Sequence, residues 1–434
     1  MRKPSPALVI FLGYIIISAF GGLILYLPIS HNGDLSFLDA LFTSTSALCV
    51  TGLIVVDTPT KYTLFGKTVI SLLILVGGLG YMTLTAFILS ATKTKGSLYA
   101  RKLVVETLGT GKLGGVLSFA SNIVVYSLII QALAILPLFL SFIRESNTFD
   151  ALFNSIFHSI SAFNNAGFSN FSNSLMDYSE DPLVNLTIMA LIVVGGIGFK
   201  VWTDVKEGRL TLHSKIAILT TLILIALPFL FFYTFEEQTR GNILKSLFAS
   251  ITPRTAGFNT VDYSKFSDLS LFLTMTLMFV GGSPGSTAGG IKTVTLALVF
   301  LWVINTLRGN RNVVAFKREI PQEVIVRAFQ TLVLAVFLIW LWVFTLSISE
   351  REILEKVGIL RLSFEVISAL CTVGLSTGSI TTPNVSLSAD FSLFGKIMIM
   401  SAMMIGRVGY LVFATSLITP RKVNYRFAKG EVVL

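Results

Sequence analysis

Charged side chains are scarce in this sequence, and their scarcity excludes an ordinary water-soluble protein. Only 13% of the 434 residues are Asp, Glu, Lys or Arg, and 53% are hydrophobic, whereas a typical soluble domain carries about 25% charged residues. Apolar runs of about 20 residues recur along the chain, which is the length that crosses a bilayer core. We therefore expect an all-α integral membrane protein with several spans.

Cysteine and histidine are also rare, which leaves little for metal or disulfide chemistry. The chain has two cysteines and three histidines, and their spacing fits neither a metal site nor a disulfide framework. Cys49 and Cys371 stand at the same position in two copies of one octapeptide, which favours two small buried residues. No His-Glu-x-x-His or Gly-x-Ser-x-Gly motif is present. An intramembrane enzyme is therefore the weaker alternative, and we expect no enzyme.

The octapeptide itself occurs four times. Ser46-Ala-Leu-Cys-Val-Thr-Gly52-Leu and Ser368-Ala-Leu-Cys-Thr-Val-Gly374-Leu differ at two positions, and Ser161-Ala-Phe-Asn-Asn-Ala-Gly167-Phe and Ile251-Thr-Pro-Arg-Thr-Ala-Gly257-Phe are looser copies. Every copy ends in glycine followed by Leu or Phe. Internal repetition of this kind predicts a repeat architecture, and four copies predict four similar units around one axis.

Each copy lies inside the same larger pattern, which is a long apolar run, a short apolar run, the glycine and a second long run. The short runs of about 12–16 residues cannot span a bilayer, so we interpret them as re-entrant half-helices. The expected units are residues 1–118, 119–213, 214–324 and 325–434. The long runs are Ala7–Pro28, Lys67–Ala91, Phe119–Ile143, Leu183–Trp202, Ser214–Phe235, Leu269–Thr306, Ile325–Ile348 and Phe391–Ile418. The short runs are Ser36–Val50, Phe149–Asn164, Asn242–Arg254 and Ile359–Cys371.

The distribution of lysine and arginine predicts the orientation. These residues gather in the loops that follow the second long run of each unit and near both termini, while the opposite loops are rich in Asp and Glu. Because positive loops stay in the cytoplasm, both termini are expected there. The net charge of +10 is then mainly an insertion signal, so we expect no nucleic-acid partner. The acidic outer side would concentrate cations near a pore mouth.

The repeat glycines are candidates for an ion filter. Glycine adopts positive φ without a Cβ penalty, so each repeat can turn its carbonyl oxygens toward a shared axis and replace the water shell of a cation. The half-helix that ends there adds the negative end of its dipole. The alternative is that the glycines only form tight turns or close helix contacts. The candidate filter residues are Val50, Thr51, Gly52, Leu53, Asn165, Ala166, Gly167, Phe168, Thr255, Ala256, Gly257, Phe258, Thr372, Val373, Gly374 and Leu375.

With these motifs the chain resembles the Trk/Ktr/HKT superfamily of potassium transporters over essentially its whole length, and the Ktr-type pore subunit most. The resemblance implies eight transmembrane helices and four half-helices, arranged as four M1–pore helix–M2 repeats around a pore. Glycine in all four filter segments implies K+ as the transported ion. Sodium dependence, and a sodium or non-selective monovalent cation transporter, are left open. The resemblance also implies a homodimer in a bacterial inner membrane and a cytoplasmic nucleotide-binding regulatory ring of the KtrA/TrkA type. No organic cofactor is expected in this chain.

A second glycine-rich stretch interrupts the third unit. The run Leu269–Thr306 would be about 57 Å long as one helix, nearly twice the thickness of a bilayer core, and its proline and five glycines favour a break. A phosphate-binding loop is a poor match, because Ile291 precedes the lysine and no strand leads into it. The resemblance implies an intramembrane gating loop at 281–292. Its small residues predict few anchoring side chains. The candidate gate residues are Gly282, Ser283, Pro284, Gly285, Ser286, Thr287, Ala288, Gly289, Gly290, Lys292 and Arg407.

Arg407 is the unusual member of this set, because it lies about 11 residues inside the last apolar run. A charge at that depth is costly and usually faces a cavity or a partner. The resemblance implies that Arg407 lies below the filter and faces the loop, and snorkelling to the cytoplasmic edge is the alternative. For Lys292 two roles are left open, the capping of a helix and snorkelling. The clusters Gly77–Gly80 and Gly195–Gly198 are expected to provide close helix packing, and a hinge is the alternative.

Overall fold

The computed structural model describes residues 6–80, 83, 86, 115–310 and 312–417. Helices dominate these residues, and a single antiparallel hairpin of β1 (Val314–Ala315) and β2 (Arg318–Glu319) is the only sheet among them. The prediction of an all-α membrane protein is confirmed. The basic segments 93–102 and 421–422 and Arg311 lie outside the described residues.

Four helices are each the first long helix of a predicted unit. They are long and apolar enough to cross a membrane, and the described residues hold a fifth such span if the bent pair α9 and α10 counts as one. Many of their large apolar side chains are exposed, such as Leu133, Leu227 and Trp340, as expected of surfaces that face lipid. The four helices are α1 (Pro6–Leu25), α7 (Val116–Phe142), α11 (Leu212–Phe235) and α15 (Gln322–Ser349).

Four further helices match the predicted short runs and lead into the repeat glycines. Three begin at side-chain caps, since Ser36, Asn147 and Asn242 each accept a hydrogen bond from the backbone N–H three residues later, which satisfies a free donor of the first turn. The fourth helix begins earlier than predicted and has non-helical dihedrals at Gly358, so its apolar part follows a kink. The four are α2 (Phe37–Cys49), α8 (Thr148–Phe163), α12 (Ile243–Ile251) and α16 (Arg351–Leu370).

The second long run is interrupted in more than one unit. The predicted break of the third unit is present, but the expectation of continuous helices in the second and fourth units was wrong. Gly198 and Gly409 interrupt these helices with nearly identical dihedrals at positive φ, φ 99° and ψ 134° against φ 98° and ψ 135°. The helices α9 and α10 are bent by 93°. Gly80 ends the first unit's helix with φ 79°. The helices are α4 (Leu64–Leu79), α9 (Pro182–Gly196), α10 (Phe199–Lys206), α13 (Asp268–Phe279), α14 (Thr293–Leu307), α17 (Leu393–Val408) and α18 (Tyr410–Leu417).

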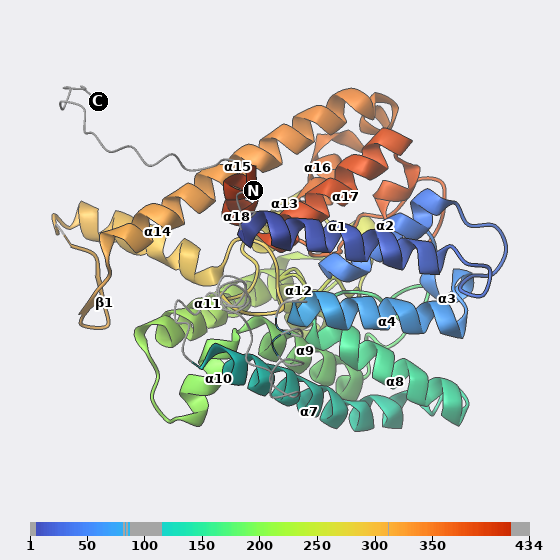
Figure 1. Cartoon of the computed structure of the whole chain (residues 1–434), viewed down its shortest axis with the longest axis horizontal. Coiled ribbons are helices and arrows are strands. Elements are labelled where there is room, and N and C mark those ends of the chain that lie inside the picture. The colour runs from blue at the N-terminus through green and yellow to red at the C-terminus, as the bar shows by residue number, and fades with distance from the viewer. Residues whose placement is uncertain (1–5, 81–82, 84–85, 87–114, 311, 418–434) are drawn as a thin grey trace, which may run out of the picture.

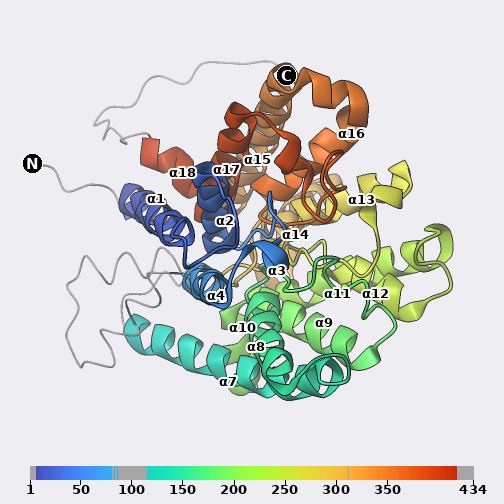
Figure 2. The same ribbon diagram turned by 90° about the vertical axis from the view of Figure 1, so that its right-hand side faces the viewer.

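Packing between units closes a ring. Within each unit the first long helix packs on its own short helix, and the second long helix packs on the short helix of the next unit: α4 on α8, α9 on α12, α13 on α16 and α17 on α2. Figure 2 shows the units following one another around a centre, from blue through green and yellow to red, and Figure 1 shows the same bundle from the side. This order is consistent with the predicted fourfold arrangement. The unit boundaries themselves stay a prediction.

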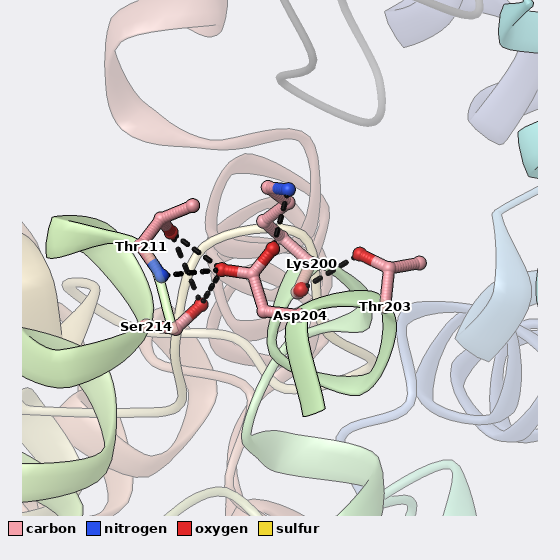
Figure 3. A network of polar contacts seen from close by, with 5 residues as sticks. All are labelled: Lys200, Thr203, Asp204, Thr211 and Ser214. Atoms are coloured by element: carbon pink, nitrogen blue, oxygen red, sulfur yellow. Dashed lines mark hydrogen bonds and ion pairs between the residues drawn. The ribbon is translucent and has the colours of Figure 1, made fainter. Parts of the chain in front are cut away.

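Short helices lie in the connections that follow the glycines. They are α3 (Thr58–Lys61), η1 (Tyr263–Lys265) and η2 (Leu387–Asp390). At the opposite end of the bundle, Asp204 ties α10 to the start of α11 (Figure 3). Its buried carboxylate accepts hydrogen bonds from Lys200 Nζ at 2.5 Å, Ser214 Oγ at 2.6 Å and the Thr211 backbone N–H at 3.0 Å. The second and third units are therefore joined firmly beyond the break at Gly198.

Candidate pore and gate

The four candidate filter segments share one backbone pattern. In each segment the first and third residues have positive φ, and the residues between them do not. Alternation in the sign of φ lets successive carbonyl groups turn toward one side of the chain, and glycine adopts positive φ without the strain that a Cβ brings. The positive-φ pairs are Val50 and Gly52, Asn165 and Gly167, Thr255 and Gly257, and Thr372 and Gly374. All twelve non-glycine residues of the segments have relative exposures of 0 or 1%.

The four glycines lie against one another in a closed ring. A Cβ built on Gly52 would lie 2.5 Å from the carbonyl oxygen of Ala166, and one on Gly167 would lie 2.8 Å from that of Ala256. The glycines of the third and fourth segments make closer approaches, Gly257 to the Val373 oxygen and Gly374 to the Thr51 oxygen. Each glycine therefore abuts the carbonyl that precedes the next glycine, in the order of the units. The structure brings all sixteen candidate filter residues to this one place.

A hydroxyl from each short helix anchors its segment, a feature that was not predicted from the sequence. The backbone N–H of Gly52 donates to Ser46 Oγ at 3.1 Å, and that of Gly374 donates to Ser368 Oγ at 3.0 Å. Ser161 Oγ and Thr252 Oγ1 instead donate to the carbonyls after the glycines, Phe168 and Phe258, both at 2.7 Å. The first residue of the octapeptide was the available signal. It is a hydroxyl in three copies, and in the third copy the hydroxyl comes one residue later, after Ile251.

A cavity of about 290 Å³ lies outside the ring, and all four repeat glycines line it. Two carboxylates, Asp57 and Asp262, also belong to its wall. Partial burial raises the pKa of Asp262, but hydrogen bonds from Ser264 and Lys265 outweigh it and leave that pKa below its usual range. Asp262 is therefore ionised at neutral pH, and a negatively charged mouth raises the local concentration of cations.

The glycine-rich loop of the third unit crosses beneath the ring and is bonded to other parts of the bundle. Its Ser283 N–H donates to the carbonyl of Gly196 at 2.8 Å, and the Phe199 N–H donates to the carbonyl of Gly285 at the same distance. The N–H of Gly289 donates to Thr255 Oγ1 in the filter at 3.3 Å. Backbone groups of the loop therefore supply much of its anchoring, and two hydroxyls add to it: Ser283 Oγ lies 2.8 Å from Thr293 Oγ1, and Thr287 Oγ1 donates to the Phe163 carbonyl at 3.1 Å.

Lys292 and Arg407 both place cationic groups against this loop. Lys292 occupies the N-cap of α14, and its Nζ donates back to the carbonyl of Ala288 at 2.7 Å, so it does not reach toward a membrane edge. Arg407 donates to the carbonyls of Thr287 and Gly77 and, at 3.0 Å, to that of Gly78. One side chain of the fourth unit thus bridges the loop of the third unit and the end of α4 in the first.

The glycine clusters provide close packing and also end helices, and a hinge at these positions stays a prediction. Gly77 and Gly195 press against the carbonyls of Leu48 and Phe163, at the ends of short helices, where a Cβ would overlap the oxygen. Gly80 and Gly198 then end the helices. The fourth unit has the same arrangement, with Gly406 against the Leu370 carbonyl and the break at Gly409. Arg407 therefore stands where the other units have Gly78, Gly196 and Gly282.

Comparison with known proteins agrees with this architecture. A family model described as "TrkH: Cation transport protein" matches residues 14–423. The Ktr system potassium uptake protein B of Bacillus subtilis is 38% identical over 99% of this chain and 96% of its own length. The potassium/sodium uptake protein NtpJ of Enterococcus hirae is 35% identical over 100% of this chain and 98% of its own.

A solved structure shares the fold. The potassium transporter TrkH of Vibrio parahaemolyticus superposes with a TM-score of 0.78, covering 97% of this chain and 86% of its own, at 19% identity. The family model and both relatives are cation transport proteins of membranes, not enzymes. The closed ring of helices, the matched length and these identities lead to one conclusion: the chain belongs to the TrkH family of cation transport proteins.

Proposed function

We propose that this protein is a potassium uptake pore whose filter is the ring of Gly52, Gly167, Gly257 and Gly374. The observation that carries the proposal is the closure of that ring, in which each glycine abuts the carbonyl before the next one. Any side chain at these positions would fill the space where carbonyl oxygens can replace the water around a cation. The potassium named in the relatives from B. subtilis and V. parahaemolyticus supports K+ as the cargo.

Sodium is the second candidate cargo. The relative from E. hirae is named for both potassium and sodium, and it matches this chain over its full length. A sodium-coupled or less selective transporter would use the same ring. Flux assays that vary the two ions separately distinguish these cases.

We further propose that the loop at 281–292 and Arg407 form the gate and that a cytoplasmic nucleotide-binding ring of the KtrA/TrkA type operates it. Lys206, Arg209 and Arg308 are exposed and lie at or just after the ends of α10 and α14, two helices that Figure 1 draws toward the same end of the bundle, which supports a cytoplasmic docking face there. The protein would act as a homodimer in a bacterial inner membrane, with both termini in the cytoplasm.

Potassium flux into liposomes tests the proposed cargo. The purified protein is expected to carry K+ down its gradient at a rate well above that of empty liposomes, and Na+ more slowly at equal concentration. Equal rates for the two ions would favour the non-selective alternative. The absence of any cation flux from well-folded protein would contradict the proposal.

Co-purification tests the docking face. Reversing the charges of Lys206, Arg209 and Arg308 to Glu is expected to abolish capture of a nucleotide-binding regulatory ring, because the basic surface that would attract it becomes acidic. Reversal of Lys265, Arg351 and Lys356 on the opposite end provides the control. Equal capture by both sets of variants would place the regulator elsewhere.

A further inference from the structure

Two fully buried titratable side chains occupy corresponding positions behind the ring. His158 lies on α8 and Glu365 on α16, each three residues before the anchoring serine of its helix, Ser161 or Ser368. Both are 0% exposed. Their units are the second and the fourth, which face each other across the ring. The first unit has Thr43 at this position, and its hydroxyl donates to the Asp39 carbonyl of its own helix at 2.9 Å.

His158 connects its helix to the outer end of the second filter segment. Nδ1 lies 2.7 Å from the carbonyl oxygen of Asn154, which only accepts, so Nδ1 carries a proton. Nε2 lies 2.9 Å from Ser169 Oγ, and Ser169 stands two residues after Gly167. The imidazole also stacks on Phe171, with ring centroids 4.8 Å apart. The imidazole is therefore held at both nitrogens and on its face. It fixes the position of Ser169, where the chain leaves the filter.

Glu365 makes the equivalent connection in the fourth unit. Its Oε1 accepts from the N–H of Ser388 at 2.9 Å and from Ser388 Oγ at 2.5 Å. The hydroxyl of Ser376, two residues after Gly374, faces the same carboxyl group. The second oxygen, Oε2, has no direct hydrogen-bond partner among the described residues. A buried carboxyl group is costly unless its oxygens are hydrogen-bonded, so the bonds from Ser388 offset part of that cost.

The other two segments are held differently. In the first unit, the N–H of Ile54 donates to Ser386 Oγ and the N–H of Ser386 returns a bond to the Ile54 carbonyl, both at 2.9 Å. In the third unit, Asn259 exchanges the same kind of pair with Ser174 Oγ and the Leu175 N–H, at 3.0 and 2.9 Å. Loops of the fourth and second units therefore fasten the first and third segments. In the second and fourth segments the corresponding hydroxyls contact their own loops, since Ser169 Oγ lies 3.3 Å from the Ser174 carbonyl oxygen and Ser376 Oγ accepts from the Leu387 N–H at 2.9 Å. His158 and Glu365 add the contacts between these hydroxyls and the short helices.

We propose that His158 and Glu365 are a matched pair of positioning residues that hold the outer mouth of the filter and thereby set its preference for K+ over Na+. The four residues two places beyond the glycines, Ile54, Ser169, Asn259 and Ser376, form this mouth and line the outer cavity. Carbonyl oxygens discriminate between cations of different size only while the backbone holds them in place. The inference rests on the proposed function, because it assigns a role in selectivity to that same ring.

Apolar and conservative substitutions at both positions test the pair. His158→Phe keeps the ring but removes its polar atoms, and His158→Gln keeps a group that can bond to Ser169. Glu365→Leu and Glu365→Gln make the same comparison, since the amide oxygen of Gln can still accept both bonds from Ser388. Ser155→Ala is the matched control, because this buried serine of α8 bonds to Ala151 of its own helix at 2.6 Å.

The readouts are the ratio of K+ to Na+ flux in liposomes and the amide hydrogen exchange of residues 165–175 and 374–388. In His158→Phe and Glu365→Leu we expect the ratio of K+ to Na+ flux to fall about fivefold or more, and the amide hydrogens to exchange faster. The Gln variants and Ser155→Ala should stay within about twofold of wild type. If the flux ratio and the amide exchange stay unchanged in the apolar variants, the proposed role of the pair is contradicted. An equal loss of K+ preference in the Gln variants would contradict it as well. Wild-type protein without K+ preference would contradict the proposed function instead, and hydrogen exchange would still decide whether the pair positions the mouth.

Discussion

Replacing Gly374 by Ser is expected to reduce the preference for K+ over Na+ at least about tenfold, which corresponds to about 1.4 kcal/mol. Two effects act together at this position. Its φ of 94° is strained for any residue with a Cβ, at roughly 1–2 kcal/mol, and the Cβ would overlap the carbonyl oxygen of Thr51. The segment must therefore shift, and its carbonyls with it. Flux of each ion through the reconstituted variant measures the effect.

The four glycines should differ in sensitivity, because their surroundings differ. A Cβ added at each position would approach the neighbouring carbonyl most closely at Gly374, then at Gly257, then at Gly52 with 2.5 Å and at Gly167 with 2.8 Å. We expect the loss of selectivity on substitution by Ser to follow that order.

Gly378 provides the control, since it has a similar φ of 85° but no atom of the described residues within 4 Å of the place where its Cβ would lie. Gly378→Ser should therefore keep the preference of wild type. The assignment of the filter would be contradicted if all four filter variants kept the K+ preference of wild type. It would also be contradicted if Gly378→Ser lost as much of that preference as they do.

Removing the guanidinium of Arg407 is expected to open the gate. Arg407→Ala loses hydrogen bonds to Thr287 of the loop and to Gly77 and Gly78 at the end of α4, and hydrogen bonds to a charged group contribute roughly 1.5–3 kcal/mol. If the closed state depends on them, K+ flux should rise on the order of 10- to 100-fold in the absence of any regulator. The positive charge that repels a passing cation is lost as well. Flux in liposomes without a regulatory ring measures the change.

Two further variants separate charge from bridging. Arg407→Lys keeps the charge but cannot reach three carbonyls with a planar fork, so its flux should lie between wild type and Arg407→Ala. Lys396→Ala removes a cation from the same helix, where it pairs with Asp39 at 2.8 Å, and should leave gating unchanged. Deletion of residues 286–288 should mimic Arg407→Ala. If both Arg407→Ala and the deletion show the flux of wild type, the loop is only a break in the helix and has no role in gating.

The sequence predicted the parts of this protein that are repeated or chemically costly. Four copies of one octapeptide indicated the short helices and the glycines, and the cluster of glycine and proline after Phe279 indicated the break in the third unit. Arg407 was noticeable because a charge is expensive inside an apolar run. In each case a local pattern carries the information, so no tertiary contact was needed to find it.

Several of the features that were missed depend on contacts between units. Gly198 was expected to provide close helix packing and Gly409 was given no role, and only the backbone of neighbouring units shows why the chain turns at these two residues. The loop's hydrogen bonds to Gly196 and Thr255 involve segments far from it in the sequence. The amino-acid composition of the loop therefore could not predict them. His158 and Glu365 were passed over for a different reason: their hydrogen bonds lie within their own units, and their equivalence appears only when the short helices are compared from the anchoring serines Ser161 and Ser368.

The central claim is that the four glycine segments surround a cation stripped of water. The most direct measurement is anomalous scattering from crystals of this protein grown with thallium, which substitutes for K+. The account predicts density on the axis of the ring, among the carbonyl oxygens of Thr51, Ala166, Ala256 and Val373, that is displaced by excess K+ and weakened in Gly374→Ser. Thallium found only in the outer cavity, with an empty ring, would contradict it.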